Sequence, residues 1–552
     1  MTLLSHIVPA TRPQALTMAE RLELEFNDAD NAARLLAVHG NDLVYVMGKG
    51  WAVWDGCRYS FRFGPVGARE IGHRLREIVL EEARAALAEF DVPDWQIERE
   101  IAEAARRRPP KEHSIDSARA HLRREKSKAL KAHATKCGNV AKVETALKAA
   151  EHQRKALVED MDRDPWVMVL PNGQLDLRAV SAWERPEAAE PEEVIAAQAS
   201  WLGPVDRARN PTRCAGVPFK PGAACPKWEA FVELIMPNPE IRACLQRCLG
   251  ATLFGENEAQ VALILRGPGG NGKSTLLNAY SHVMGRQDGY AAACKIEMFL
   301  ETGTASPGAA TPEEADMPGA RAYIATEPGA RDVLSAKKIK GLTGGDRRMS
   351  RGLFADPFFW TPHGVPILSC NRTPKIKDED EGTRRRLVFL PFDVNLRALP
   401  PEKQRPQGEV EAELRAEGPG ILNWLIDGYR DFKRQGIAMP EPMRRLKDQL
   451  LEAADPVGVF LSEMCEVVQK GRVSVTDFYA VYERWCEEEG RTLYQSKTVG
   501  DIMVEKGFER FKTMGRSHWR DLDWSADAAG MVEAVTGQRP ASAPRPADPP
   551  AF

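Results

Sequence analysis

The spacing of apolar residues changes several times along the 552-residue chain, and each change predicts a different kind of element. Residues 28–40 have helical spacing. Residues 43–61 contain two apolar runs separated by a glycine-rich turn, which predicts a β-hairpin. Residues 69–91 carry apolar side chains on one helical face, and residues 166–177 predict a second short hairpin around an Asn-Gly turn. The first third of the chain is therefore expected to be mixed α+β.

A different pattern begins at residue 259, where short apolar runs alternate with stretches of helical spacing. This alternation predicts a parallel α/β domain over residues 259–395. Residues 226–258 before it predict a helical linker or collar, and residues 396–454 after it predict a helical segment. Residues 455–524 predict two amphipathic helices followed by a hairpin, an order typical of a winged helix.

The two ends of the chain are less regular. Residues 1–27 show no clear period and remain unassigned, so the N-terminal α+β domain is placed at residues 28–225. Residues 525–552 are rich in alanine and proline and carry too few apolar side chains to form a core. They are predicted to be a disordered tail.

Composition narrows the class of protein. Hydrophobic residues make up 43% of the chain and charged residues 28%, which is typical of globular domains. No apolar run approaches the roughly 18 residues that a membrane span needs, and the first residues lack the features of a secretory signal. The ten cysteines form no CxxC pair and no zinc spacing, which argues against both a disulfide scaffold and a zinc ribbon. We expect a cytoplasmic protein without a membrane partner.

The net charge of −3 means that any contact with nucleic acid must come from local patches. One such patch spans residues 106–155, which carry fifteen Lys or Arg against five Asp or Glu. Two interpretations stay open: a solvated helical face, or a surface that contacts nucleic-acid phosphates.

The clearest chemical signal is the motif GPGGNGKST, which matches G-x-x-x-x-G-K-[ST] between an apolar strand and a helix. Glycines let the backbone curl so that its N–H groups point at phosphate oxygens, and the following helix adds its positive end. The lysine reaches the β- and γ-phosphates, and the serine hydroxyl ligates Mg²⁺. The pattern predicts binding of ATP with Mg²⁺ by Gly267, Pro268, Gly269, Gly270, Asn271, Gly272, Lys273, Ser274 and Thr275.

Polar residues follow the later strands of the same domain. The strand ARAYIATEP ends at Glu327, whose carboxylate can polarise an attacking water, and VPILSCNRTP ends at Asn371, which can sense the γ-phosphate. Arg384, Arg385 and Arg386 precede the last strand, where a guanidinium could act as an arginine finger. Between these strands lies a basic stretch with a Gly-Gly-Asp turn, which contains Lys337, Lys338, Lys340, Arg347, Arg348 and, at its end, Arg351.

The chain closely resembles superfamily 3 helicases, and most closely their phage, plasmid and poxvirus primase-helicase branch. The resemblance lies in five motifs and in their order along the chain: GPGGNGKST, ATE, KGLTGGD, SCNRTP and GTRRRLVFLPF. WAVWDG and LPNGQLDL resemble the helicase-associated domain of that branch, CPKW its linker, and EGPGILNWLIDGY the segment after its core. The resemblance covers roughly residues 28–524. It implies an α/β fold with a P-loop core of the AAA+ type, an N-terminal helicase-associated domain and a C-terminal winged helix.

The resemblance also implies roles for single residues. Glu327 would be the Walker B carboxylate, the catalytic base and, with Ser274, a group near Mg²⁺. Because the residue before it is Thr326 and not an acid, only one carboxylate ends this strand. Asn371 would be the sensor, and Arg385 or Arg386 the finger. The segment from Lys337 to Arg351 would hold single-stranded DNA, and the winged helix would add phosphate contacts from Lys497, Lys506, Lys512, Arg516 and Arg520.

Primase-polymerases of this branch carry a separate catalytic domain with paired aspartates. The early cluster Asp160-Met161-Asp162-Arg163-Asp164 is interpreted as a turn and not as a two-metal site. The expected function is that of an ATP-dependent DNA helicase in phage, prophage or plasmid replication. It would act on single-stranded and forked DNA as a ring, and the resemblance implies six subunits in that ring. A separately encoded primase or polymerase is a further expected partner. The alternatives are an origin-binding initiator that uses ATP only to assemble and a P-loop ATPase that remodels protein partners, which the basic stretch and the winged helix disfavour. For the terminal domain, the alternative is a protein-docking module.

Overall fold

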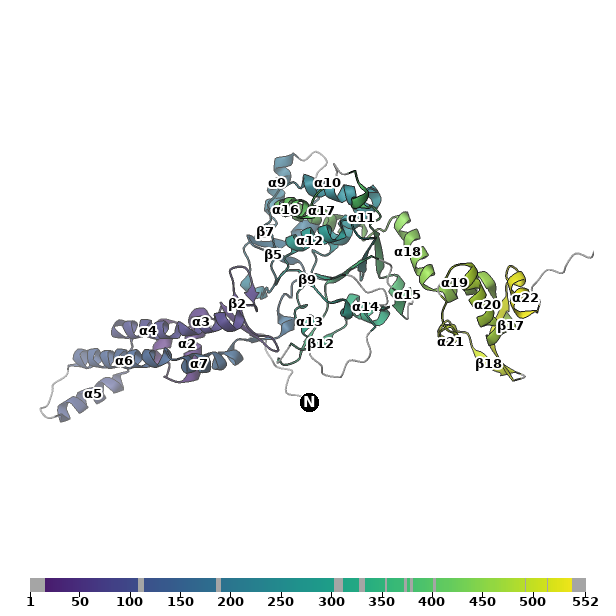
Figure 1. Cartoon of the computed structure of the whole chain (residues 1–552). Helices are drawn as coiled ribbons and strands as arrows, with labels where there is room; N and C mark the ends of the chain where they lie inside the picture. Colours follow the sequence, from purple (N-terminus) through teal and green to yellow (C-terminus); the bar gives the residue numbers. More distant parts are fainter. Residues whose placement is uncertain are drawn as a thin grey trace, which may run out of the picture. The chain divides into compact units, whose positions relative to one another are not determined.

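The computed structural model describes residues 15–107, 114–184, 190–301, 311–326, 333–352, 355–371, 375–377, 381–400, 404–491, 493–513 and 515–538. The chain forms two compact units, residues 1–439 and residues 440–552 (Figure 1). The second unit therefore begins inside the segment 396–454 that was predicted to be one helical stretch.

The N-terminal part of the first unit combines helices with a small sheet in the order β3-β2-β1-β4. The predicted hairpin is confirmed, because β1 pairs antiparallel with β2. The helix predicted over residues 69–91 is two helices that meet at Arg74. The elements are α1 (Met18–Glu23), α2 (Asp28–His39), β1 (Leu43–Val46), β2 (Gly50–Trp54), β3 (Tyr59–Ser60), α3 (Gly64–His73), α4 (Leu75–Glu89), α5 (Asp94–Arg106), α6 (Ile115–Cys137), α7 (Val140–Gln153) and β4 (Lys155–Ala156).

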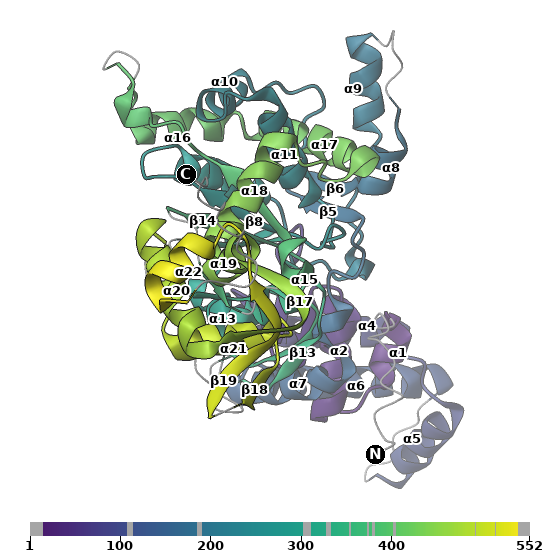
Figure 2. The same cartoon turned by 90° about the vertical axis from the view of Figure 1, so that its right-hand side faces the viewer.

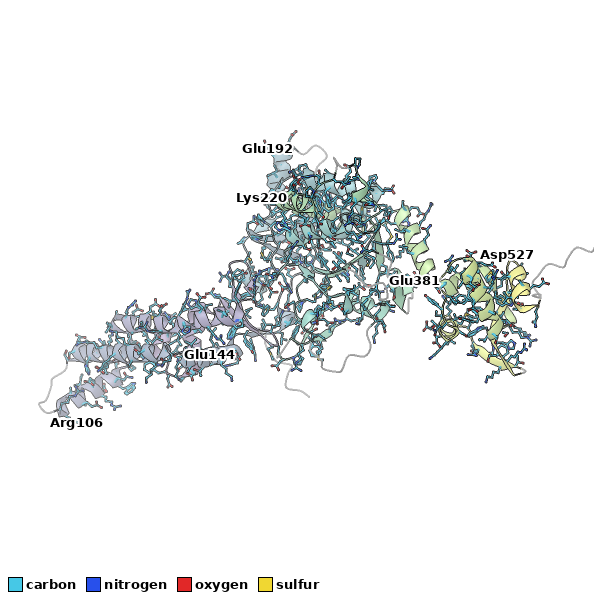
Figure 3. All side chains as sticks on the ribbon, viewed as in Figure 1. Arg106, Glu144, Glu192, Lys220, Glu381 and Asp527 are labelled. Atoms are coloured by element: carbon cyan, nitrogen blue, oxygen red, sulfur yellow. The ribbon has the colours of Figure 1, made fainter. Side chains whose placement is uncertain are left out.

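These helices have their own apolar core. Leu75 and Val79 of α4 pack with Leu130 and Ala134 of α6, and all four side chains are at most 1% exposed. Figure 3 labels Arg106 at the end of α5 and Glu144 on α7 in this helical region. The described part of the basic segment is thus largely α6 and α7, which pack against α4 and α2 in a helical bundle.

A second small sheet, β5-β6-β7, connects this region to the central domain. The predicted hairpin around Asn172-Gly173 is confirmed by the antiparallel pairing of β5 and β6. The connecting elements are η1 (Val158–Asp160), β5 (Val167–Leu170), β6 (Gly173–Asp176), α8 (Leu177–Ala182), α9 (Pro191–Ala199), β7 (Leu202–Gly203), η2 (Arg207–Arg209), α10 (Pro226–Ile235) and α11 (Pro239–Ala251).

The central domain is built on a five-stranded sheet with the order β16-β8-β14-β10-β9, and every neighbouring pair is parallel. The predicted parallel α/β domain is confirmed. Strand β14 is buried along its whole length, as expected for a strand covered on both faces. The elements are β8 (Ala262–Arg266), α12 (Lys273–Met284), β9 (Ala291–Ala293), η3 (Ile296–Met298), α13 (Pro312–Ala315), β10 (Ala322–Thr326), β11 (Val333–Ser335), α14 (Ala336–Thr343), β12 (Arg348–Ser350), β13 (Phe358–Trp360), β14 (Val365–Cys370), β15 (Lys375–Lys377), α15 (Glu381–Arg384) and β16 (Leu387–Pro391).

After the sheet the chain returns to the helices that precede it, through η4 (Leu396–Ala398), α16 (Gln407–Ala416) and α17 (Gly418–Gln435). Helix α17 lies along α11, and α10, α11, α16 and α17 gather on one side of the sheet in both views (Figures 1 and 2). The two helices approach closely at Gly250 and Gly428. A Cβ on Gly250 would lie 2.3 Å from the amide nitrogen of Tyr429, so no larger residue fits there without a shift.

The second unit has the element order helix, helix, strand, helix, helix, strand, strand and a final helix. Its sheet order is β17-β19-β18, with both pairings antiparallel. The elements are α18 (Glu441–Ala454), α19 (Pro456–Met464), β17 (Cys465–Ser474), α20 (Val475–Glu488), α21 (Ser496–Glu505), β18 (Arg510–Thr513), β19 (Arg516–Trp524) and α22 (Ala529–Thr536). Phe460 is the centre of an aromatic core with Phe478, Tyr482, Trp485 and Trp524.

The predicted start of the disordered tail at residue 525 is wrong. Ser525 donates a hydrogen bond to the carbonyl of Glu463, and α22 buries Val532 in the same core as Phe460. The side chains of this stretch are small, but they pack into a folded helix because the aromatic core supplies most of the apolar surface. Among the described residues, no helix is long and apolar enough to cross a membrane.

Candidate nucleotide-binding site

The motif GPGGNGKST forms the turn between β8 and α12, at the edge of the sheet where the parallel strands end. Gly270 and Gly272 both have positive φ, 81° and 85°. A Cβ on Gly272 would also lie 2.6 Å from Cγ2 of Ile235, so both space and backbone require glycine there. The loop curls as a phosphate-binding loop does, and the N-terminus of α12 follows it directly.

Lys273 is only 4% exposed, and its amine lies inside the loop. It donates hydrogen bonds to the carbonyl of Gly267, to Oδ1 of Asn271 at 3.0 Å and to the carbonyl of Pro268 at 3.3 Å. Asn271 in turn donates to the carbonyl of Phe392 at 2.8 Å, which ties the loop to the end of β16. The ammonium is therefore already held against the loop that would surround a phosphate chain.

The register of the sheet brings three strand ends together. Thr326 lies opposite Ser369, and Ser369 lies opposite Leu265. The amide of Gly267 donates to the carbonyl of Cys370 at 3.2 Å, so the exposed Asn371, which follows, is close to the start of the loop. Glu327 follows Thr326 but lies outside the described residues.

A cavity of about 660 Å³ opens beside the loop. Its walls come from α10, from the loop itself, from η4 and the chain after it, and from α16. The sequence motif pointed only to the loop residues, because the other three walls are far from the loop in the chain. The cavity is lined by Lys227, Ala230, Phe231, Leu234, Gly270, Gly272, Thr275, Leu396, Arg397, Leu399, Gln404, Arg405, Gln407, Val410, Glu413 and Leu414.

The lining of this cavity combines charged and apolar side chains. Arg405 and Lys227 both pair with Glu413, at 2.8 Å and 3.2 Å, and these two bonds hold the pKa of Glu413 well below its usual range. Phe231, Leu234, Leu396 and Val410 provide apolar surface. A flat heterocyclic base on an apolar wall, with its phosphates on the adjacent loop, fits this arrangement.

Magnesium would be held by few protein groups. The exposed Ser274 hydroxyl lies at the first turn of α12, where it can reach a cation on the phosphates. In the part of the chain that the structure describes, no group of three His, Cys, Asp or Glu side chains could hold a metal ion. Mg²⁺ sites that rely on one or two protein groups and on substrate phosphates are common, so the residues present fit this cation.

The three adjacent arginines lie near the N-terminal ends of the strands, whereas the loop lies at their C-terminal ends. Leu387, the first residue of β16, pairs with Ala262, the first residue of β8. The loop begins only after β8 ends, five residues and about 16 Å further along. Arg386 turns back on its own chain and donates to the carbonyl of Gly382 at 2.6 Å, while Arg385 is exposed.

The basic stretch between β11 and β13 is a helix and a hairpin, and its cations have different surroundings. Lys337 on α14 is exposed. Lys338 donates to the carbonyl of Glu297 at 3.1 Å, and burial lowers its pKa. Arg347 forms two bonds with Glu159, at 2.9 Å and 3.2 Å, and Arg348 pairs with Glu314. Lys340 also lies on α14 and is half-buried.

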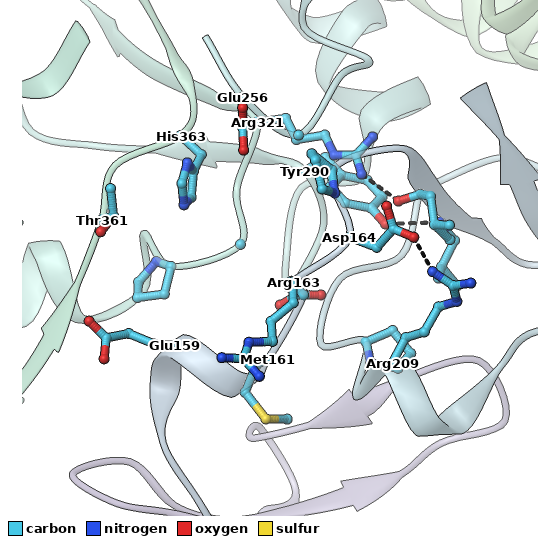
Figure 4. Close-up of a pocket in the computed structure, with 18 of the residues that line it drawn as sticks. Glu159, Met161, Arg163, Asp164, Arg209, Glu256, Tyr290, Arg321, Thr361 and His363 are labelled. Atoms are coloured by element: carbon cyan, nitrogen blue, oxygen red, sulfur yellow. Dashed lines mark hydrogen bonds and ion pairs between the residues drawn. The ribbon is translucent and has the colours of Figure 1, made fainter. Parts of the chain in front are cut away.

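A second cavity, of about 340 Å³, is lined by Met161, Asp162, Arg163 and Asp164 of the early aspartate cluster (Figure 4). Each aspartate has a structural partner. Asp160 accepts from the amide of Leu157 and Asp162 from the amide of Thr212. Asp164 pairs with Arg178 and Arg209. The interpretation of this cluster as a turn agrees with these bonds, which leave the carboxylates pointing at their own backbone and at arginines.

The predicted DNA contacts of the second unit lie on two different elements. Lys497 is exposed on α21, whereas Lys512 and Arg516 are exposed at the ends of β18 and β19. Lys506 pairs with Asp455 at 2.7 Å. In the N-terminal bundle, Arg124, Lys128 and Lys131 share the exposed face of α6, and the structure leaves both interpretations of that face open.

Residues 32–237 match the family model described as "D5 N terminal like". The chain is also similar to viral proteins named putative helicases. It is 28% identical over 269 residues to one from Acanthamoeba polyphaga mimivirus, covering 46% of this chain and 28% of that protein. It is 30% identical over 171 residues to one from Frog virus 3, covering 30% and 17%. For one from Invertebrate iridescent virus 3, the identity is 27% over 280 residues, covering 46% and 29%.

The matched part of the chain thus spans less than a third of each of these relatives. Among solved structures, the apo C-terminal region of NrS-1 is similar with a TM-score of 0.34 and 10% identity, over 54% of this chain and 75% of that one. The family match and the viral relatives confirm the resemblance to the phage and poxvirus type of primase-helicase, with its superfamily 3 helicase motifs.

Proposed function

We propose that this protein is an ATP-dependent DNA helicase of the superfamily 3 type, with a P-loop core of the AAA+ class and a C-terminal winged helix. The observation that carries the proposal is the loop GPGGNGKST at the strand ends of a parallel sheet, with Lys273 buried inside it and a cavity for a base beside it. The strand order, with β8 between β16 and β14, agrees with that class. The names of the viral relatives give the reaction that ATP hydrolysis would drive.

In this proposal each residue has one task. Lys273 neutralises the β- and γ-phosphates, and backbone N–H groups of the loop bind their oxygens. Bound Mg²⁺ would spread the developing negative charge, with Ser274 as a ligand. Glu327 accepts a proton from the attacking water, and Asn371 orients that water. Arg385 would serve the nucleotide of a neighbouring subunit in a ring, since its own loop lies beyond its reach.

The base cavity gives a prediction that is independent of hydrolysis. Leu396→Ala removes part of one apolar wall, and we expect the Kd of ATP to rise about 5- to 30-fold because roughly 1–2 kcal/mol of apolar contact is lost. The Kd of inorganic tripolyphosphate should not change, because it touches only the loop. Both can be measured by competition against a fluorescent nucleotide. Equal losses for both ligands would place the base elsewhere.

DNA binding by the first unit is predicted to depend on Lys337 more than on its arginine neighbours. Lys337→Ala should reduce the log–log salt slope of single-stranded DNA binding by about 0.7, the loss of one phosphate contact. Arg347→Ala is the matched comparison, because Arg347 already pairs with Glu159. It should leave the slope nearly unchanged. The reverse order of effects would mean that the ion pair opens to bind DNA and that Lys337 is only solvated.

The test of the proposed function is strand displacement on forked DNA, with ATP and without it. Displacement that requires ATP supports a helicase. Binding to a specific duplex with ATP hydrolysis but without displacement would instead support the alternative, an origin-binding initiator. This alternative rests on the second unit, because its helices and strands follow one another in the order of a DNA-binding winged helix.

A further inference from the structure

The sheet of the second unit has two different faces, and the strand register tells them apart. Trp519 lies opposite Arg510 on β18 and is 1% exposed, packed in the aromatic core. Side chains alternate between faces along a strand, so Phe511 and its partner His518 lie on the other face. That outer face points away from the core of the unit.

The outer face combines rings with cations. The rings of Phe511 and His518 lie 5.8 Å apart at an interplanar angle of 35°. The guanidinium of Arg520 lies over the ring of Phe511 at 5.4 Å. On the neighbouring strand β17, Arg472 lies opposite Arg520, and it is exposed. Arg516, at the start of β19, is on the same face and also exposed.

The part of this face around the two rings carries three arginines and one carboxylate, whereas Glu466 and Asp523 lie opposite each other further along β17 and β19. Glu509 pairs with Arg520 at 2.8 Å, with its side chain 70% exposed, so water and salt weaken the pair. The three arginines flank the two rings along adjacent strands β17, β19 and β18, which lie side by side in Figure 2. Rings next to arginines on an open sheet are the arrangement on which successive bases can stack while phosphates are held.

Helix α21, the element that would enter a groove in a winged helix, has the opposite character. Its exposed side chains include Lys497 but also Asp501 and Glu505. Lys506, just after its end, is paired with Asp455. One cation against two carboxylates makes this helix a poor surface for phosphates.

We propose that the outer face of the β17-β19-β18 sheet binds a single strand of DNA, with bases stacked on Phe511 and His518 and phosphates held by Arg472, Arg516 and Arg520. The proposal rests on the proposed function, because it takes DNA to be the substrate. A single strand is favoured over a duplex because stacking on a ring needs an accessible base face, which a duplex lacks. An acidic protein could pair with the arginines but would not use the rings.

The test uses the full chain and a fluorescent oligo-dT, with anisotropy measured over a series of salt concentrations. Replacing Arg472, Arg516 and Arg520 with alanine should lower the log–log salt slope by about 2, which is about 0.7 for each phosphate contact. Phe511→Ala should weaken binding about 5- to 150-fold, as expected for one lost stacking contact, with the slope unchanged. Phe511→Tyr keeps the ring and should bind like the wild type.

Lys497→Ala on α21 is the matched control and should have little effect. The inference is overturned if the triple variant keeps the wild-type salt slope, or if Lys497→Ala weakens oligo-dT binding more than the triple variant does. It is also overturned if only duplex DNA or an acidic polypeptide displaces the oligo-dT, and does so only while the three arginines are present. These outcomes differ from a failure of the proposed function, in which the wild-type chain would bind no single-stranded DNA at all. A near-UV circular dichroism spectrum like that of the wild type, measured for each variant, shows that the aromatic core of the second unit has folded.

Discussion

Replacing Lys273 with alanine is expected to lower the rate of ATP hydrolysis by at least about 100-fold. Lys273 is 4% exposed, and its amine already lies among the carbonyls of Gly267 and Pro268 and the side chain of Asn271. No other described lysine or arginine lies inside the loop, so the charge of the β- and γ-phosphates would lose its closest cation. Steady-state phosphate release measures the effect.

Lys295→Ala is the matched control for this variant. Lys295 is a lysine of the same domain that forms a surface ion pair with Glu313, and its side chain is 66% exposed. Its removal should leave the hydrolysis rate within about 2-fold of the wild type, because a surface ion pair contributes little to stability. Hydrolysis by Lys273→Ala near the wild-type rate would mean that the loop is not the site of the reaction.

Replacing Arg385 with alanine is expected to lower ATP hydrolysis by about 10³- to 10⁵-fold while leaving ATP binding intact, if it is a finger supplied by the neighbouring subunit. The loop lies at the C-terminal ends of the parallel strands and Arg385 near their N-terminal ends, so one subunit cannot bring them together. Arg386→Ala should act differently. Its guanidinium is bound to Gly382 in its own chain, so its loss should disturb local stability more than turnover.

Mixing variants separates a shared site from a local one. A Lys273→Ala subunit has no working loop but keeps Arg385, and the Arg385→Ala subunit is the reverse. Rings that contain both would have some interfaces with one intact loop and one intact arginine, so part of the hydrolysis should return. If mixed rings form, as shown by co-purification of two tags, and no activity returns, the arginine acts within its own chain or is structural.

The parts of the fold that the sequence predicted well are those whose signal is local. The parallel domain was predicted because apolar runs such as VALIL and VPILSC are short, continuous and separated by helical stretches. The hairpins at Gly48 to Gly50 and at Asn172-Gly173 were predicted because turn residues determine them. The helix over residues 69–91 was predicted as one element, whereas its continuous amphipathic pattern conceals a break at Arg74.

The parts that could not be predicted depend on contacts between distant segments. The base cavity joins Phe231, Gly270 and Leu396, which no spacing rule connects. The separate surroundings of Lys337 and Arg347 come from Glu159, which lies nearly 190 residues earlier in the chain. Helix α22 was missed because its core partners are the aromatic residues of other elements and not its own short apolar side chains.

The most direct test of the central claim is strand displacement on DNA forks, with a labelled strand and with tails of either polarity, in the presence of ATP and Mg²⁺. The account predicts displacement by the wild-type chain from a fork with one preferred tail. It predicts none without ATP, none by Lys273→Ala and little by Arg385→Ala, while all three proteins still bind the fork. ATP hydrolysis at a normal rate with no displaced strand from any fork, by a chain that binds single-stranded DNA, would contradict the claim that this protein is a helicase.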